Sequence, residues 1–347
     1  MRDYLQIIAE GDTLSQEQAE AVMHVLLRGD ASSEEIAALL LGLRSRGETL
    51  DELTGFTKVM REYAVKVEAP EGAIDLCGTG GDHAGSFNIS TSASFVAAGA
   101  GVVVAKHGNR AVSSDAGSAD VLAALGVDTT LGKDGVEACL REAGIAFLFA
   151  PLYHPALKHV MPIRRTLGVR TFFNILGPLC NPARVKRQLV GAFSDATAKQ
   201  MAQILVRLGS EHVVCIYAHD GLDELSTTSP TTVYQTGSEL DPFGAQTLMQ
   251  QVVTPEHYGL GRVRASELDG GTAEENAEIV RTILRGEAGP QRDIVLLNAA
   301  YALLASGQHG ALGSCLKAAA ESIDSGAALA KLDALVEASN DYAATAA

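Results

Sequence analysis

Hydrophobic side chains in the first 66 residues follow the spacing of amphipathic helices. Within residues 36–43 and 53–63 they recur at intervals of three and four, which places them on one helix face. They are Ile36, Leu39, Leu40, Leu43, Leu53, Phe56, Met60 and Tyr63. Helix starts are marked by capping-box pairs, a Ser or Thr with Gln or Glu three residues later. These pairs are Ser15 with Gln18, Ser32 with Glu35, and Thr49 with Glu52. The segment is predicted to be helical packing without chemistry.

After a candidate boundary at residues 65–72, short apolar runs alternate with helical segments. Runs typical of buried strands are 74–77, 102–105, 126–129, 145–149, 185–193, 213–217 and 232–235. Helices are predicted at 92–98, 121–125, 134–143 and 154–159, and over most of 292–347. This alternation predicts a parallel or mixed sheet. The predicted fold class is therefore α/β, with a small all-helical N-terminal domain, residues 1–66, and a larger α/β domain, residues 67–347, that has a mostly parallel sheet.

Length and charge narrow the classes of function. A chain of 347 residues suggests about two domains. It carries 27 Lys and Arg residues against 42 Asp and Glu residues, a formal net charge of −15. Such an acidic chain is a poor binder of nucleic acids and anionic membranes. The cations that hold an anionic substrate must therefore be local.

Cysteine usage and the N-terminus predict a cytoplasmic location. The five cysteines are scattered, odd in number and without a CxxC pair, which argues against a disulfide framework and a zinc site. The N-terminus lacks a basic stretch followed by a long apolar core. The apolar run 95–105 is too short to span a bilayer.

The candidate chemistry is concentrated between Ala73 and Arg110. A strand leads into the glycine loop 78–82, a polar segment precedes a helix, and a second strand leads into residues 106–110. A glycine loop before a helix N-terminus presents backbone N–H groups to an anion. By itself the loop fits a tight turn equally well, and Lys106 and Arg110 fit a solvated loop. Together these features indicate a site for a phosphorylated ligand that also carries a metal.

Three further groups are chemically suggestive, each with a plainer alternative. Asp223 and Glu224 are adjacent carboxylates, which are usually surface charge but also suit Mg²⁺ beside substrate phosphates. Ser118 opens a predicted helix and either caps it or donates to a phosphate. Arg164 belongs to a basic pair that usually marks a solvated face.

In this order and spacing the motifs resemble the anthranilate phosphoribosyltransferase family. They are GTGGD at 78–82, NIST at 88–91, KHGNR at 106–110, GSAD at 117–120, the run 154–181, DGLDE at 220–224 and NAA at 298–300. The resemblance covers nearly the whole chain. It implies a nucleoside phosphorylase/phosphoribosyltransferase-like fold in which a segment near 164–186 completes the helical domain. The aromatic substrate then lies between the two domains.

The resemblance implies the reaction and the residues that serve it. The phosphoribosyl group of 5-phosphoribosyl 1-pyrophosphate (PRPP) passes to the amine of anthranilate in tryptophan biosynthesis, pyrophosphate leaves, and the protein is a homodimer with two Mg²⁺ ions per subunit. Implied PRPP contacts are Gly78, Gly81, Asp82, Ser86, Asn88, Ile89, Ser90, Thr91, Lys106, His107, Gly108, Asn109, Arg110, Ser113, Ser114 and Ser118. Implied anthranilate contacts are Gly78, Asn109 and Arg164. Implied metal ligands are Ser90, Asp223 and Glu224.

No residue is assigned as a dedicated acid or base, because an aromatic amine is already neutral near pH 7. His107 is interpreted as shaping the aromatic pocket or satisfying a loop hydrogen bond rather than as a base. His83, where the family usually has a small residue, lies at the diphosphate or points to solvent.

Two other functions are weighed. A pyrimidine nucleoside phosphorylase resembles this family in fold, but GTGGD, Arg164 and the Asp223–Glu224 pair favour the transferase. The second is not enzymatic: some relatives with this fold have lost the diphosphate motifs and bind nucleic acid through a basic surface. Here the motifs are present and the net charge is −15.

Overall fold

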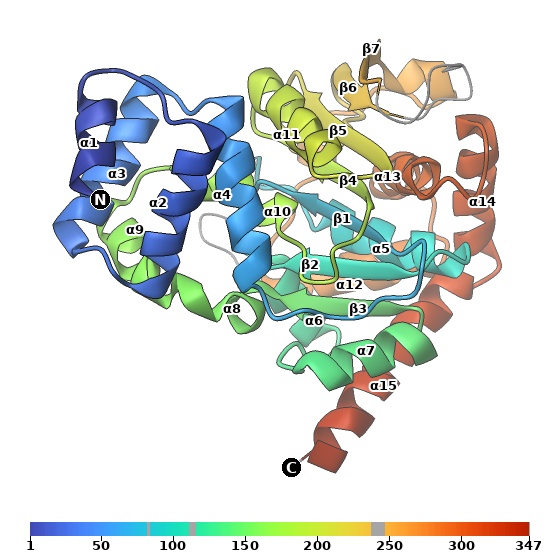
Figure 1. The fold of residues 1–347 in the computed structure, drawn as a ribbon. Helices are drawn as coiled ribbons and strands as arrows, with labels where there is room; N and C mark the ends of the chain where they lie inside the picture. Colours follow the sequence, from blue (N-terminus) through green and yellow to red (C-terminus); the bar gives the residue numbers. More distant parts are fainter. Residues whose placement is uncertain (82–83, 111–115, 237–246, 347) are drawn as a thin grey trace.

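The computed structural model, which describes residues 1–81, 84–110, 116–236 and 247–346, has a helical part beside an α/β part (Figure 1). The helical part begins with α1 (Arg2–Ala9), α2 (Gln16–Arg28), α3 (Ser33–Arg46) and α4 (Leu50–Tyr63). All three predicted capping boxes are present at the starts of α2, α3 and α4. The predicted apolar faces of α3 and α4 are buried, except that Tyr63 is half-buried.

The α/β part is built on a mixed sheet in the order β3-β2-β1-β4-β5-β6-β7. The strands are β1 (Ile74–Gly78), β2 (Val104–Gly108), β3 (Ile145–Phe149), β4 (Arg187–Gly191), β5 (His212–Ala218), β6 (Thr231–Gln235) and β7 (Met249–Val253). β1 to β5 are parallel, and β6 and β7 pair antiparallel. The predicted fold class, an all-helical N-terminal part with a mostly parallel α/β part, is confirmed.

The remaining helices cover the sheet, except that α9 and α10 contact α3 and α4 of the helical part. They are α5 (Ile89–Gly99), α6 (Ser118–Ala124), α7 (Lys133–Glu142), α8 (Ala150–Tyr153), η1 (Pro155–His159), α9 (Met161–Leu167), α10 (Phe173–Leu179), α11 (Asp195–Arg207), η2 (Pro255–Tyr258), η3 (Ala265–Glu267), α12 (Ala273–Leu284), α13 (Pro290–Ser306), α14 (Leu312–Asp324) and α15 (Ala327–Ala346). Within the described ranges, no helix combines the length and the apolar character needed to cross a membrane.

Alternate side chains of β4 and β5 enter two different hydrophobic cores. Leu189 and Val214 pack in a core with α5 and α13, whereas Val190 and Cys215 pack in a core with α11 and the N-terminal helices. Successive strand residues point to opposite faces, so the sheet separates the two cores. The ring of Phe172, just before α10, stacks on Phe56 of α4 with centroids 4.5 Å apart. Residues after β3 therefore pack against the N-terminal helices.

Residues 126–129 are not a strand, so that prediction is wrong. Gly126 ends α6 with a left-handed φ of +98°. The N–H of Val127 bonds back to the carbonyl of Leu122, and the N–H of Asp128 donates to Ser339 Oγ of α15 at 3.1 Å. These donors serve helix-end contacts and are not available to a sheet.

Two predicted boundaries also move. α5 begins at Ile89 instead of residue 92, because Ser92 N–H already bonds to the carbonyl of Asn88. β2 extends to Gly108, with Lys106 in register with Phe147 of β3. Lys106 was predicted to follow the strand, but it lies within it and is only 4% exposed.

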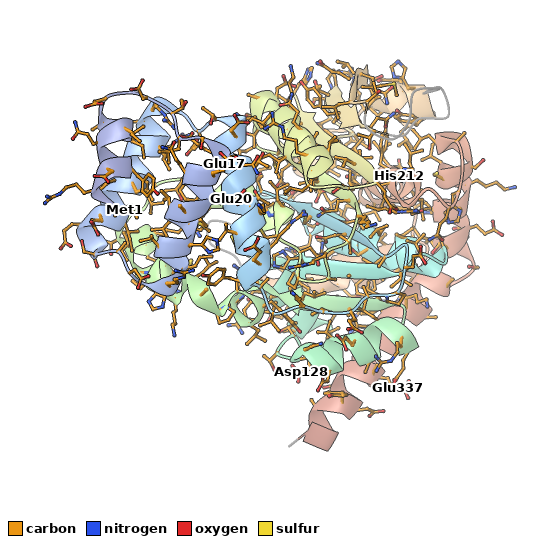
Figure 2. All side chains as sticks on the ribbon, in the orientation of Figure 1. Met1, Glu17, Glu20, Asp128, His212 and Glu337 are labelled. Atoms are coloured by element: carbon orange, nitrogen blue, oxygen red, sulfur yellow. The ribbon has the colours of Figure 1, made fainter. Side chains whose placement is uncertain are left out.

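Acidic side chains are distributed over both parts of the molecule. Glu17 and Glu20 lie on α2, Asp128 follows α6, and Glu337 lies on α15 (Figure 2). The net negative charge is therefore not gathered at one element.

Candidate active site

The carboxyl ends of β1 and β4 meet beneath the Asp223–Glu224 pair. From β1 the chain builds β2 and β3 on one side and then β4 on the other, so a switch point lies between β1 and β4. Ligands of open α/β sheets bind at such points. Gly78 and Gly191, in register at these strand ends, both lie against Asp223. A Cβ on Gly191 would overlap the backbone of Asp223, so that position requires glycine, and a Cβ on Gly78 would displace the Asp223 carboxylate.

The glycine loop and the start of α5 are each joined to this acidic pair. Gly80 N–H donates to Asp223 Oδ2 at 2.7 Å. Ser90 N–H, in the first turn of α5, donates to Glu224 Oε1 at 3.0 Å. The structure thus brings together three motifs that lie 143 and 134 residues apart in sequence.

Lys106 supplies a buried cation at the same place. Its Nζ donates to the carbonyl of Leu76 at 2.7 Å and to Ser90 Oγ at 3.3 Å. Burial lowers the pKa of Lys106, while nearby carboxyl groups, Asp75 first, oppose that shift. Burial and the adjacent Asp223 charge raise the pKa of Glu224, which the Lys106 ammonium partly offsets.

The donor set fits Mg²⁺. Asp223 and Glu224 are adjacent carboxylates that repel one another, and a divalent cation would remove that repulsion. Carboxylate and hydroxyl oxygens are hard ligands, and Mg²⁺ commonly takes one or two carboxylates with substrate phosphates and waters. Across the described ranges no group of three or more His, Cys, Asp and Glu side chains gathers as a complete protein cage.

Side chains bridge β1 and β2 where their strand pairing stops. The two strands share the register pair Ile74 and Val104. Beyond it, Asp75 Oδ1 accepts the N–H of His107 at 3.1 Å, and Asn181 Nδ2 donates to the carbonyl of Ala105 at 2.8 Å. Asp75 is fully buried, and burial raises its pKa. Asp75 was not predicted from the sequence as a site residue, because an isolated acidic residue in an apolar strand has no pattern of its own.

The segment before α5 is held by α12. Ser86 forms a β-bridge with Asp269. Asn88 occupies the N-cap position, but its side chain does not cap α5. Its Nδ2 donates to the carbonyl of Ala116 at 3.2 Å, and its Oδ1 accepts from Asn276 at 3.0 Å. Asn88 is therefore the N-cap residue by position only, and its side chain instead joins the start of α5 to Ala116 and to α12.

Ile89 and Thr91 are buried at the start of α5. Ile89 packs in the core, and Thr91 Oγ1 is buried with no hydrogen-bond partner. Thr91 and Lys106 both line a small cavity of about 10 Å³. Ligand contacts at Ile89 can therefore come only from its backbone.

Beyond β2, the chain turns toward α6. Gly108 is half-buried, and Asn109 and Arg110 are exposed. Ser118 Oγ donates to the carbonyl of Asn109 at 3.2 Å, which places the start of α6 beside the end of β2. Arg110 lies 3.9 Å from Asp120 and over the ring of Phe149.

Two histidines lie side by side on the helical side of the site. The rings of His107 and His154 have centroids 5.2 Å apart, and both residues are at least 94% buried. Burial holds the pKa of His107 well below its ordinary value and lowers that of His154 to about 4. Each Nε2 is buried without a hydrogen-bond partner. His154 was not predicted from the sequence as a site residue, although it is the first residue of the run 154–181 that supports the resemblance.

Arg164 lies half-buried on α9. Its guanidinium sits over the ring of Phe173, 5.0 Å from the centroid, and contacts Met161 Sδ at 3.4 Å. Burial lowers its pKa. No carboxylate among the described residues forms an ion pair with it. Arg165, by contrast, is exposed.

Arg170, between α9 and α10, was not selected from the sequence. Its Nη2 donates to the carbonyl of Gly81, and its guanidinium lies 4.8 Å from the centroid of Phe193, just past β4. It therefore connects the segment that carries Arg164 to the glycine loop. The signal available was its position in the run 154–181, in which only Arg164 was chosen.

Four predicted positions lie outside the described residues: Asp82, His83, Ser113 and Ser114.

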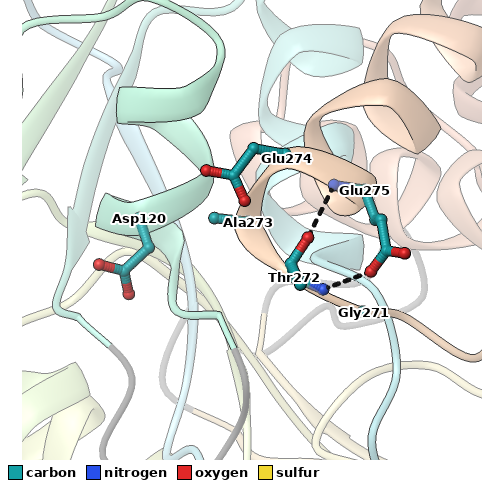
Figure 3. A pocket seen from close by; sticks show the side chains of 6 residues that line it. All are labelled: Asp120, Gly271, Thr272, Ala273, Glu274 and Glu275. Carbon is teal, nitrogen blue, oxygen red and sulfur yellow. Dashed lines mark hydrogen bonds between the residues drawn. The ribbon is translucent and has the colours of Figure 1, made fainter.

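A cavity of about 600 Å³ opens beside the site, between α6 and the start of α12 (Figure 3). Its lining includes the carboxylates of Asp120, Glu274 and Glu275. Such a lining disfavours phosphate, so we do not place the diphosphate in this cavity.

Comparisons with known proteins agree over the full chain. Residues 2–64 match the glycosyl transferase family, helical bundle domain, and residues 70–329 match the glycosyl transferase family, a/b domain. The anthranilate phosphoribosyltransferase of Salinibacter ruber is 59% identical over 98% of this chain and 99% of its own length.

Solved structures agree as well. The Thermus thermophilus anthranilate phosphoribosyltransferase superposes with a TM-score of 0.90 at 40% identity, covering 97% of this chain and 99% of that one. The Saccharomyces cerevisiae enzyme in complex with PRPP and Mg gives a TM-score of 0.86 at 28% identity, covering 98% and 97%. The yeast enzyme in complex with 4-fluoroanthranilate gives a TM-score of 0.84 at 26% identity with the same coverage.

Proposed function

The chain belongs to the anthranilate phosphoribosyltransferase family, and we propose that the site at the ends of β1, β2 and β4 carries that family's reaction. The enzyme transfers the phosphoribosyl group of PRPP to the amine of anthranilate, giving N-(5-phosphoribosyl)anthranilate and pyrophosphate in tryptophan biosynthesis. The roles of the residues are proposed from one observation. The glycine loop, the start of α5, Lys106 and the Asp223–Glu224 pair are joined by hydrogen bonds at one place.

The diphosphate of PRPP is bound by backbone N–H groups and local cations. The glycine loop and the first turn of α5 supply N–H groups, and a helix N-terminus favours an anion. Lys106 adds a buried positive charge directly beside Ser90. Further PRPP contacts come from the predicted residues between Gly108 and Ser118. All sixteen PRPP contacts predicted from the sequence are part of this proposal.

Ser90, Asp223 and Glu224 would hold Mg²⁺, two ions per subunit. When bound with the substrate, Mg²⁺ neutralises charge on the leaving diphosphate. The carboxylates themselves orient the glycine loop, through Gly80, and the start of α5, through Ser90. Binding of the ion to these two carboxylates would therefore also affect the positions of the glycine loop and the start of α5, which bind PRPP.

Anthranilate lies between the glycine loop and α9. Arg164 binds its carboxylate, since a guanidinium can present two parallel donors and Arg164 has no ion-pair partner among the described side chains. Asn109 and Gly78 are further contacts. His107 and His154, neutral because they are buried, line the aromatic side.

Displacement at the anomeric carbon needs positioning more than acid–base chemistry. The amine nitrogen forms a bond to C1 as the C1–oxygen bond to pyrophosphate breaks, and charge on the sugar rises toward a cation. An aromatic amine has a free lone pair near pH 7, so no base is needed to activate it. The proton that the nitrogen must lose once the bond to C1 has formed passes to water or to the departing pyrophosphate. Fixed donors aimed at the departing oxygens lower the barrier by electrostatic stabilisation.

We also propose the division into residues 1–66, completed by the segment near 164–186, and residues 67–347. The stacking of Phe172 on Phe56 supports it. A homodimer through the helical part is supported by the exposed apolar side chains of Leu41 on α3 and of Val169, which follows α9. Light scattering on the purified protein tests the dimer.

A cytoplasmic location is supported by the five free cysteines.

A fluorescence assay tests the function. Anthranilate fluoresces, and its consumption is followed in the presence of PRPP and Mg²⁺. Loss of fluorescence that requires both PRPP and Mg²⁺ is the expected result. No turnover from folded protein at high concentrations of both substrates would contradict the proposal and would favour the nucleoside phosphorylase alternative.

A further inference from the structure

A single buried amide on α13 holds the residue that follows Glu224. Asn298 Oδ1 accepts the N–H of Leu225 at 2.9 Å, and its Nδ2 donates to the carbonyl of Leu225 at 2.9 Å. The same Nδ2 donates to the carbonyl of Ile294, one helical turn earlier, at 2.8 Å. Asn298 and Leu225 are both fully buried. The contact therefore fixes both polar groups of Leu225, much as a neighbouring strand would.

Asp220 forms hydrogen bonds inside the loop between β5 and β6. Asp220 Oδ2 accepts from Ser226 Oγ at 2.7 Å and from Thr228 Oγ1, and its Oδ1 accepts the N–H of Leu222 at 3.3 Å. These bonds shape the loop from inside. Its other bonds to distant segments include those of Asp223 with Gly80 and of Glu224 with Ser90, and that of the Thr227 carbonyl with the N–H of Val263. At its centre, a further contact supports the loop. Asn298 attaches it to α13, and α13 packs against β1, β4 and α5. The helix that supports the strand ends thus also supports the acidic pair.

We propose that Asn298 is a positioning residue that sets the Asp223–Glu224 pair for Mg²⁺ in the PRPP complex. This inference rests on the metal role proposed above for that pair. Mg²⁺ demands near-ideal octahedral geometry, so small displacements of its carboxylates weaken binding. The peptide of Leu225 is bonded directly to Glu224, and loss of the Asn298 contact would leave two buried peptide groups without partners. The loop would then move to satisfy those groups and would displace Glu224.

The test is calorimetric binding of PRPP at limiting and at saturating Mg²⁺, with no anthranilate present. In the Asn298→Ala protein we expect PRPP binding to weaken about tenfold at limiting Mg²⁺, the scale for loss of an outer partner of a metal ligand. The defect should shrink at saturating Mg²⁺. Asn298→Ser, whose hydroxyl still satisfies part of the buried peptide, serves where Asn298→Ala does not fold, and should show a smaller defect of the same kind.

Leu297→Ala is the matched control. Leu297 is the preceding residue of α13 and is 1% exposed, but it packs in the core of the α/β part. This variant should lower the melting temperature while leaving PRPP binding within about twofold of wild type at both Mg²⁺ levels. A general loss of stability is thereby separated from a loss of positioning.

Asp223→Asn separates failure of this inference from failure of the proposed metal site. If Asp223→Asn removes the Mg²⁺ dependence of PRPP binding while both Asn298 variants bind as wild type, the positioning role of Asn298 is wrong. If Asp223→Asn binds PRPP with the normal Mg²⁺ dependence, the metal role of the acidic pair is wrong, and the inference falls with it.

Discussion

Asp223 Oδ2 accepts a 2.7 Å hydrogen bond from the backbone N–H of Gly80, a residue 143 positions earlier in the chain. The bond ties the proposed metal site to the glycine loop before any substrate binds. A change in either group should therefore alter both PRPP and Mg²⁺ binding.

Gly78→Ala should impair this junction. The new Cβ would lie 2.8 Å from Asp223 Cγ and nearer still to Oδ2, so the carboxylate must leave Gly80. We expect the KM for PRPP to rise about tenfold or more, with stronger dependence on Mg²⁺, measured by steady-state kinetics. Gly313→Ala, on α14 with open space around its Cα, is the control and should leave the kinetics unchanged. An unaltered KM for PRPP in Gly78→Ala would argue against the tight junction.

Arg164→Ala should weaken anthranilate binding selectively. Loss of a hydrogen bond between charged groups costs about 1.5–3 kcal/mol, so the KM for anthranilate should rise about 10- to 150-fold while that for PRPP changes little. Arg165→Ala removes the adjacent but exposed arginine and should be near neutral. The assignment fails if the two variants behave alike.

Arg170→Gln should act on the other substrate. It removes the guanidinium that bonds to the Gly81 carbonyl and covers Phe193. The glycine loop then loses a charge-assisted bond, so the KM for PRPP should rise about 5- to 30-fold, corresponding to about 1–2 kcal/mol. The exposed Arg285→Gln, on the far end of α12, provides the comparison. A rise in the anthranilate KM alone would assign Arg170 to the aromatic site instead.

Acid should destabilise the folded protein through His154. Its pKa falls from 6.5 to about 4 on burial, so below about pH 6.5 the unfolded chain takes up a proton that the folded chain does not. Stability is then lost as the pH falls toward about 4, at about 1.4 kcal/mol per pH unit. Urea unfolding should show the advantage of wild type over His154→Gln shrinking by about 2 kcal/mol between pH 7 and pH 5. A constant difference between the two proteins would show that His154 does not titrate in this way.

Glu52→Ala should destabilise the helical part strongly. The buried Glu52 carboxylate accepts from Leu14 N–H and Thr49 N–H, each at 2.8 Å, and pairs with Arg46. Removing it leaves a cation and two N–H groups unpaired, for a loss of about 3–5 kcal/mol in unfolding free energy. Glu35→Ala, at the same capping-box position of α3 but without an ion pair, should cost only about 1 kcal/mol. Thermal unfolding measures both, and equal losses would refute the special role of Glu52.

Local signals in the sequence determined the starts of α2, α3 and α4, most strands and the residue types of the site. Capping boxes act over four residues, and apolar periodicity acts over one element, so neither depends on distant contacts. The glycine loop, the cationic strand end and the acidic pair were visible as residue types suited to phosphate and Mg²⁺. Their joint occurrence was enough to indicate a family.

Only the tertiary structure decided how these parts meet. Three contacts of the site depend on which strands are neighbours in the sheet. They are the contacts of Asp223 with Gly80, of Lys106 with Ser90, and of His154 with His107. Residues 126–129 have the composition of a strand, but backbone N–H groups within them bond to helices instead. One of these partners is Ser339, more than two hundred residues away in sequence. Asn298 and Arg170 both lie in motifs that support the resemblance, but their roles could not be read from those motifs, because their partners are backbone groups of distant loops. Such contacts follow from packing between elements, which sequence periodicity does not encode.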